Sequence, residues 1–251
     1  MKRVLIFYLY VFATPNSFAQ TDSVNYSAAN TLYENRNYSQ AAYMYETLLK
    51  NNGPSAEIYY NLGNAYYKNG KMGNAILNYE RCLSLEPRNR DAKFNLSLAN
   101  LRIKDKLQPV DELLITQWWH ASLNLFTAKT WSLITIFLCW LSLPGLALYL
   151  FSKKIRFRKI GFFAAVICFL LFLFTSITTF SKVSYDNNVM FAIITSPSAI
   201  VKSGPSESET NLTILHEGLK LQVLDTDGEW AKVKLANGVI GWVLVNNYTG
   251  I

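Results

Sequence analysis

The chain has 251 residues and a formal net charge of +7, which allows two small domains and a membrane segment. The charge does not indicate a nucleic-acid partner, because one short loop supplies five of the cations: Lys153, Lys154, Arg156, Arg158 and Lys159. Three cysteines and two histidines show neither the pairing of a disulfide scaffold nor metal-ligand spacing. No metal or cofactor site is therefore predicted.

The first 19 residues have the pattern of a secretory signal peptide. A Lys2-Arg3 start and an apolar body over residues 4–13 precede the small-x-small sequence Ser17-Phe18-Ala19. An uncleaved membrane helix is the alternative, but the apolar body is short and Pro15 interrupts it. The pattern predicts cleavage after Ala19 and export of the segment that begins at Gln20.

Residues 20–106 are predicted to be helical with a 34-residue period, in two repeats (22–55 and 56–89) and a capping helix (90–106). The second copy has small and aromatic residues at fixed spacings: Tyr59, Leu62, Gly63, Tyr66, Ala75, Tyr79, Cys82 and Pro87. These residues resemble the tetratricopeptide repeat (TPR) at all eight of its signature positions, with Tyr for Trp and Cys for Ala. The resemblance implies an all-α TPR superhelix. Because about three repeats are usually needed for a stable stack, we expect support from a partner, the membrane surface or a dimer.

In TPR domains the first helix of each repeat lines a concave face that holds extended peptides. The resemblance places six residues near that face: Asn30, Tyr60, Asn61, Asn64, Tyr67 and Asn95. Asn offers a donor and an acceptor to a peptide backbone; the alternative is a solvated, unspecific face. Asn30 and Asn61 match the asparagines of the carboxylate clamp of some TPR domains, whereas Tyr26, Asp91 and Asn95 stand at its basic positions.

Residues 107–130 mix leucines and tryptophans with polar side chains, as in an amphipathic helix in the membrane interface. The pair Trp118-Trp119 suits the headgroup zone, where an apolar ring and a polar N–H are both satisfied. His120 belongs to the same belt, and we interpret it as interfacial rather than catalytic.

Two uncharged apolar runs come next, at residues 131–151 and 160–180. Each is about 20 residues long and can cross roughly 30 Å of hydrocarbon as a helix. The loop 152–159 between them is basic, and such short loops stay in the cytoplasm. A transmembrane hairpin is thus predicted in the cytoplasmic (inner) membrane, with the domains on both sides of it in the periplasm. Neither run has an ionisable residue, so transport is not predicted.

Residues 185–251 change to the two-residue alternation of strands. Five are predicted: Val189–Thr195, Ala199–Lys202, Leu219–Leu224, Trp230–Leu235 and Val239–Val245. The segment resembles bacterial-type Src-homology-3-like domains in Val201-Lys202-Ser203-Gly204-Pro205-Ser206, Leu215-His216-Glu217-Gly218, Glu229-Trp230-Ala231-Lys232-Val233 and Gly241-Trp242-Val243. The resemblance implies a small all-β barrel.

The barrel of this family often binds cell-wall peptide or glycan, and sometimes a neighbouring protein. Trp230, Trp242 and Tyr248 could form an aromatic ligand patch. The alternative, which we favour, makes Trp230 and Trp242 core and corner residues. His216 stands in a strand-end turn, and the sequence shows no motif that arranges an acidic or nucleophilic companion for it.

The domain order as a whole defines a multidomain membrane protein that resembles the BatE family, the TPR component of the Bat aerotolerance proteins. The resemblance covers the full chain. It implies a periplasm-facing scaffold with von Willebrand factor A-domain membrane partners and, indirectly, a MoxR-type ATPase. The alternative is a sensor or anchor that binds peptidoglycan through the barrel. With no nucleophile–base motif, glycine-rich phosphate loop or metal cluster, an enzyme is not predicted.

Overall fold

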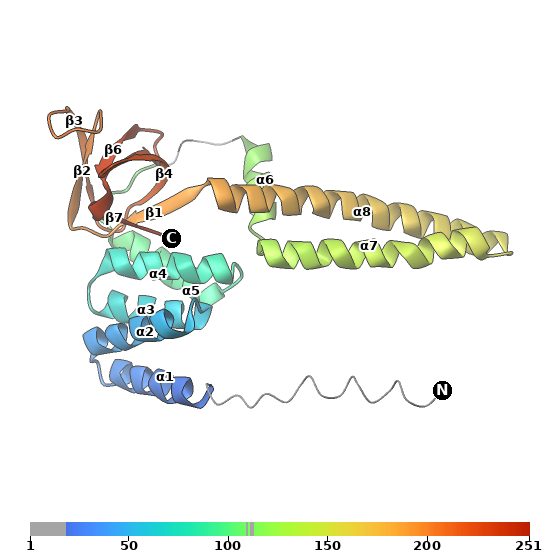
Figure 1. The fold of residues 1–251 in the computed structure, drawn as a ribbon, viewed down its shortest axis with the longest axis horizontal. Coiled ribbons are helices and arrows are strands. Elements are labelled where there is room, and N and C mark those ends of the chain that lie inside the picture. Colours follow the sequence, from blue (N-terminus) through green and yellow to red (C-terminus); the bar gives the residue numbers. More distant parts are fainter. Residues whose placement is uncertain (1–18, 109, 111–112) are drawn as a thin grey trace.

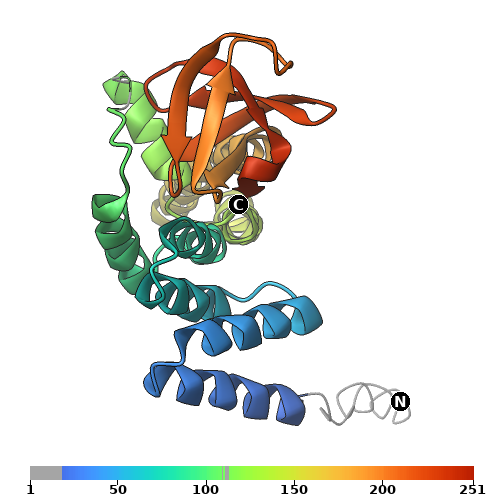
Figure 2. The same cartoon turned by 90° about the vertical axis from the view of Figure 1, so that its left-hand side faces the viewer.

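The computed structural model describes residues 19–108, 110 and 113–251. The predicted signal peptide lies outside them except for its last residue, and its cleavage stays a prediction. Figure 1 shows a helical stack and a curved sheet at one end of the molecule, with a long helical hairpin extending away from both. These parts follow one another along the chain in the predicted order, and Figure 2 shows the sheet directly above the stack.

Five helices form the N-terminal stack: α1 (Ala19–Glu34), α2 (Tyr38–Asn52), α3 (Ala56–Lys68), α4 (Met72–Leu85) and α5 (Arg90–Arg102). Helices α3 and α4 fill the predicted repeat 56–89, and α5 is the capping helix. Gly63 lets α3 approach α4 closely, because a Cβ atom there would lie 2.7 Å from the ring of Tyr79. Equivalent positions of the two repeats are buried alike: Ala41 and Ala75, and Tyr45 and Tyr79.

A short helix, α6 (Leu114–Leu123), occupies the predicted interfacial segment. It packs on the long helical hairpin through the ring of His120, whose centroid is 5.6 Å from that of Tyr185. Its other side exposes apolar residues, among them Ile115 and Trp118. In Figure 1 it lies across the direction of the hairpin, near the end that adjoins the two domains.

The hairpin consists of α7 (Ala128–Phe151) and α8 (Ile155–Asn188), both long and apolar enough to cross a membrane. They pack closely where small residues meet, since a Cβ on Gly161 would lie 2.7 Å from the carbonyl oxygen of Gly145. Thr135 and Thr179 add a hydrogen bond between the helices, 3.2 Å long. Most of the remaining apolar surface faces outward.

Helix α8 is longer than the predicted span 160–180 at both ends. Its first turn takes up most of the predicted loop 152–159, including Arg156, Arg158 and Lys159. At the other end it continues beyond the apolar run, supported by a 2.8 Å ion pair between Lys182 and Asp186 one turn apart. Only one residue, Val189, separates α8 from the first strand.

The C-terminal domain is one antiparallel sheet of seven strands in the order β3-β2-β6-β5-β4-β1-β7. The strands are β1 (Met190–Ile194), β2 (Ser198–Lys202), β3 (Asn211–His216), β4 (Lys220–Asp227), β5 (Trp230–Leu235), β6 (Ile240–Leu244) and β7 (Tyr248–Gly250), with a 3-10 turn, η1 (Val245–Asn247), before the last. The prediction of five strands missed β3 and β7. Strand β3 exposes its apolar Leu212 and Ile214, and β7 is only three residues long, so neither gives a clear alternating pattern.

The helical stack and the sheet share an interface, formed mainly by α4 and β1. Ile193 of β1 is fully buried in the helical core, and Gly73 of α4 lies against the backbone of Ile194 and Gly218. A 2.8 Å ion pair joins Glu80 to Lys220 at its edge. The support expected from a partner, the membrane or a dimer therefore comes at this surface from the chain's own sheet, which covers helices that two repeats leave unpaired.

Gly73→Ala tests this interface, because the substitution should raise the stability of the protein if the interface is absent and lower it if the interface is present. In a free helix alanine is favoured over glycine by up to about 1 kcal/mol. Here the added Cβ would lie 2.8 Å from the carbonyl oxygen of Ile194, so we expect a destabilisation of about 1–3 kcal/mol and a lower Tm in detergent. Gly250→Ala is the control, because its Cβ would meet no atom within 4 Å. A higher Tm for Gly73→Ala would show that the stack and the sheet do not touch here.

Candidate functional site

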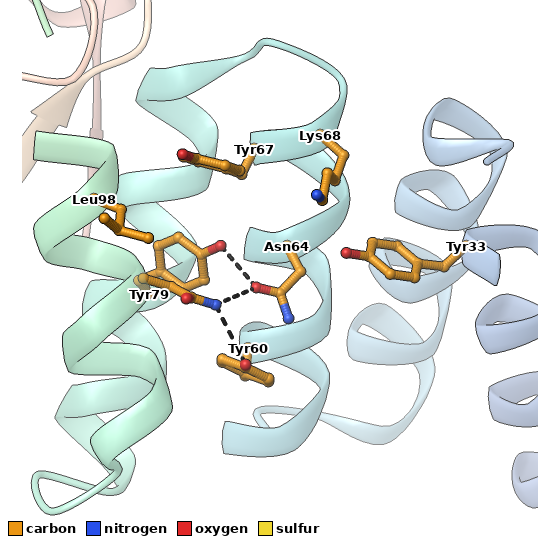
Figure 3. Close-up of a pocket in the computed structure, with 8 residues that line it drawn as sticks. Tyr33, Tyr60, Asn64, Tyr67, Lys68, Tyr79 and Leu98 are labelled. Carbon is orange, nitrogen blue, oxygen red and sulfur yellow. Dashed lines mark hydrogen bonds between the residues drawn. The ribbon is translucent and has the colours of Figure 1, made fainter. Parts of the chain in front are cut away.

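The candidate site is the face of the stack formed by α1, α3 and α5, the first helices of successive repeats. A pocket of about 280 Å³ opens on it, lined by Tyr33, Tyr60, Asn64, Tyr67, Lys68, Tyr79, Asn95 and Leu98. Figure 3 shows these side chains converging from α1, α3, α4 and α5. Four of the six predicted peptide-contacting residues, Tyr60, Asn64, Tyr67 and Asn95, thus line one pocket.

Tyrosine and asparagine side chains crosslink this face with the period of the repeat. Within the first repeat, the Tyr45 hydroxyl donates to Asn30 Oδ1 over 2.5 Å. The same bond recurs 34 residues later, where the Tyr79 hydroxyl donates to Asn64 Oδ1 over 2.8 Å. Each bond ties the first helix of a repeat to its second helix.

A second set of bonds joins neighbouring repeats. Asn61 Nδ2 donates to the Tyr26 hydroxyl over 2.6 Å, and, 34 residues on, Asn95 Nδ2 donates to the Tyr60 hydroxyl over 3.3 Å. Asn95 also donates to Asn64 Oδ1 over 2.8 Å. We call these bonds, with those of Tyr45 and Tyr79, the Tyr–Asn ladder; it fixes α1, α3 and α5 relative to one another.

Burial raises the pKa of three phenols of the ladder. It raises the pKa of Tyr26 to about 12, helped by the hydrogen bond that this phenol donates to the Glu57 carboxylate. Burial is also the largest cause of the raised pKa of Tyr45 and of Tyr79. These three hydroxyls therefore stay protonated and keep donating to Glu57, Asn30 and Asn64 throughout the physiological pH range.

The carboxylate clamp is not reproduced. Its two matching asparagines are engaged inside the protein, Asn30 with Tyr45 and Asn61 with Tyr26. Tyr26 in turn donates to a carboxylate, Glu57, 2.6 Å away. A ligand carboxylate at this place would meet a carboxylate in place of the cations of a clamp.

The two tryptophans of the sheet domain lie outside its buried core, whereas the favoured interpretation made them core and corner residues. Ala231, Val233 and Val243 point into the core. Trp230 and Trp242 therefore lie on the other face of the sheet, where they are half-buried and where Lys202 Nζ is 5.9 Å from the Trp230 ring centroid. Neither tryptophan belongs to the buried core, so the core part of the favoured interpretation, which made them core and corner residues, does not hold.

Tyr248 does not follow the two tryptophans. It lies on β7, an edge of the sheet, and packs against the buried core, where burial raises its pKa. The sheet thus brings together two of the three residues of the predicted aromatic patch.

His216 has an acidic companion that sequence reasoning missed. Its backbone N–H donates to Asp105 Oδ2 over 2.5 Å, and its Nδ1 lies 3.0 Å from Asp105 Oδ1. Lys104 Nζ lies 2.9 Å from the other ring nitrogen. Since Asp105 follows α5 and His216 ends β3, the cluster holds the end of the stack to the sheet. Over the described ranges, no group of three or more His, Cys, Asp or Glu could hold a metal ion.

Comparison with protein families agrees with both domain resemblances. Residues 56–89 match the tetratricopeptide repeat model, and residues 197–249 match the bacterial SH3 domain model. Both are non-catalytic binding domains, so the matched regions define a protein with two binding modules joined by an apolar hairpin. Comparison with curated proteins gives no match.

Tyr26→Phe tests the ladder. The phenyl ring keeps the packing but loses the hydrogen bonds to Asn61 and Glu57, so we expect a loss of about 0.5–1.5 kcal/mol in the free energy of unfolding. Because the folded-state pKa is raised from 10.0 to about 12, the wild-type Tyr26 contribution falls as pH rises from 10 towards 12. The free energy of unfolding of the variant should therefore fall less than that of the wild type as the pH rises from 10 towards 12.

Chemical denaturation at neutral and alkaline pH measures both effects. Tyr43→Phe is the matched control, because the Tyr43 side chain is 71% exposed on α2. An equal effect of the two substitutions would contradict the ladder.

Proposed function

We propose that the protein is a membrane-anchored scaffold that binds partner proteins through the pocketed face of its TPR stack. The observation that carries this proposal is the convergence of α1, α3 and α5 on one pocket, held by the Tyr–Asn ladder. A preorganised face loses less conformational entropy when it binds a segment of another protein.

The hairpin supplies the anchor in this proposal. Its outward surface is apolar along both helices, as lipid contact requires. The cluster Lys153, Lys154, Arg156, Arg158 and Lys159 lies at its far turn and favours a cytoplasmic position for that turn. The other end of both helices then leads to the periplasmic side.

The stack–sheet interface supports this topology independently of charge. The stack precedes the hairpin in sequence and the sheet follows it, yet Glu80 and Lys220 form an ion pair. Two domains in contact occupy one side of a membrane, and an even number of crossings between them achieves this. This contact supports a common side for the two domains, and because the basic turn favours the cytoplasm, we assign both domains to the periplasmic face of the inner membrane.

The classes of partner protein are proposed from the domain order of the chain, which resembles that of the BatE family. Von Willebrand factor A-domain membrane proteins would bind the TPR face, and a MoxR-type ATPase would be linked to the assembly indirectly. The TPR match supports protein partners in general, and the naming of these two rests on the resemblance of the whole chain.

A second function, attachment to peptidoglycan through the sheet domain, is favoured by one observation. Trp230 and Trp242 lie on the outward face beside Lys202 and Lys232, an arrangement suited to stacking against sugar rings or stem peptides. The bacterial SH3 match is consistent with this role.

Affinity purification of full-length variants from detergent-solubilised membranes separates the two functions. Leu98→Glu places a negative charge in the pocket, and we expect it to release protein partners. Trp242→Ala should abolish binding to purified cell wall and leave protein partners bound. Tyr43→Ala, on the exposed side of α2, is the control. Partners retained by Leu98→Glu and lost by Trp242→Ala would contradict the scaffold proposal and favour the wall anchor.

A further inference from the structure

The hydrogen-bond polarity of the TPR pocket identifies the chemistry of the group that it receives. Asn64 Oδ1 accepts two bonds, from the Tyr79 hydroxyl and from Asn95 Nδ2. A carbonyl oxygen has two acceptor sites, so both are used. The Asn64 amide consequently presents its NH₂ group to the pocket. Figure 3 shows this nitrogen pointing away from the two bonded donors.

Two further polar groups of the pocket can donate. The Tyr60 hydroxyl accepts from Asn95, which leaves its own O–H free to donate. Lys68 contributes an ammonium, and among the described residues that line the pocket it is the one with a charge. The side chains of Lys68 and Tyr33 lie on the same side as the Asn64 nitrogen in Figure 3.

The surrounding charges favour an anion. The Arg102 guanidinium lies 4.6 Å from the ring centroid of Tyr67, a pocket residue, and adds positive charge at the rim. Glu57 is not among the lining residues and accepts the hydrogen bond of Tyr26. A pocket that offers donors next to two cations favours an anionic acceptor, and in an unmodified protein that acceptor is a carboxylate.

Next to the pocket, α5 exposes apolar side chains that no later helix of the stack covers. Phe94 is 63% exposed and Leu101 67% exposed, and they flank the pocket residue Leu98 at helical spacing. A partner segment seated here would place apolar side chains on α5.

We propose that the pocket binds a carboxylate of an acidic partner segment, held by the Asn64 amide, the Tyr60 hydroxyl and Lys68, while apolar residues of the segment cover Phe94 and Leu101. This inference rests on the proposed function of the TPR face in binding partner proteins, and it names the chemical group of the partner that the pocket recognises. The site differs from the carboxylate clamp, since Asn30 and Asn61 are occupied within the protein. Its carboxylate comes from an Asp or Glu side chain or from a C-terminus.

Two arrays of random peptides test the proposal with the full-length protein in detergent. The peptides of one array are blocked at both ends, and those of the other end in a free carboxylate. Enrichment of Asp and Glu on the blocked array identifies a side-chain ligand, whereas enrichment confined to the second array identifies a C-terminus. For the best acidic peptide, replacing the carboxylate by its amide should weaken binding about fivefold, the scale of one ionic contact at a partly exposed site.

Lys68→Met should cause the same loss of about fivefold and leave the amide peptide unaffected. Lys50→Met, which removes an equal charge from α2 outside the pocket, should change neither. Binding without a preference for carboxylates, a preference for cationic peptides, or an unchanged preference in Lys68→Met would overturn this inference and leave the TPR-binding function standing. No binding to either array would overturn both.

Discussion

The arrangement of this protein depends on the contact between α4 and β1. Gly73 allows the backbone of α4 to touch that of Ile194 and Gly218, and Ile193 completes the helical core from the sheet side. A two-repeat stack alone exposes the apolar surface that a third repeat would cover. The sheet covers part of it, so the two binding modules form one body, and the Tyr–Asn ladder is built on a stack that the sheet stabilises.

This joint also connects the stack and the sheet to the apolar hairpin. Helix α8 enters β1 after a single residue, and the Lys182–Asp186 pair supports its last turns beyond the apolar run. On the other side of the hairpin, the Arg88 guanidinium lies 4.0 Å from the ring centroid of Phe126, just before α7. The stack and the sheet are thus each attached to one helix of the hairpin and to each other. A partner bound at the TPR face is held at a fixed height and orientation above the membrane in the proposed topology.

The parts of the fold that repeat locally could be predicted from the sequence. The 34-residue period, the two apolar runs and the hairpin turns of the sheet each depend on neighbours within one element. The contacts between domains could not, because Asp105 and His216, or Gly73 and Gly218, are brought together only by the fold. The strand β3 was not predicted because two of its apolar residues, Leu212 and Ile214, face solvent.

The hydrogen bonds of the predicted peptide-contacting residues did not follow from their chemical type. Of the four predicted asparagines, Asn64 and Asn95 line the pocket, and all four form hydrogen bonds with tyrosines of the stack. A signal for this was present, since Tyr26 and Tyr60, and Tyr45 and Tyr79, recur with the same 34-residue spacing as Asn30 and Asn64. Similarly, the alternation around Ala231 and Val233 places Trp230 outside the core. In both cases the register of neighbouring residues carried more information than the chemical type of the residue itself.

The central claim is that the stack and the sheet form one rigid body, and a spin-label distance tests it most directly. Nitroxides would be attached at Gln40→Cys on α2 and Thr213→Cys on β3, both exposed, in full-length protein whose native Cys82, Cys139 and Cys168 are replaced by alanine. Pulsed dipolar spectroscopy in detergent should give one narrow distance distribution, centred on the separation in the structure. A broad distribution, or one centred elsewhere, would show that the two domains move independently and would contradict the account.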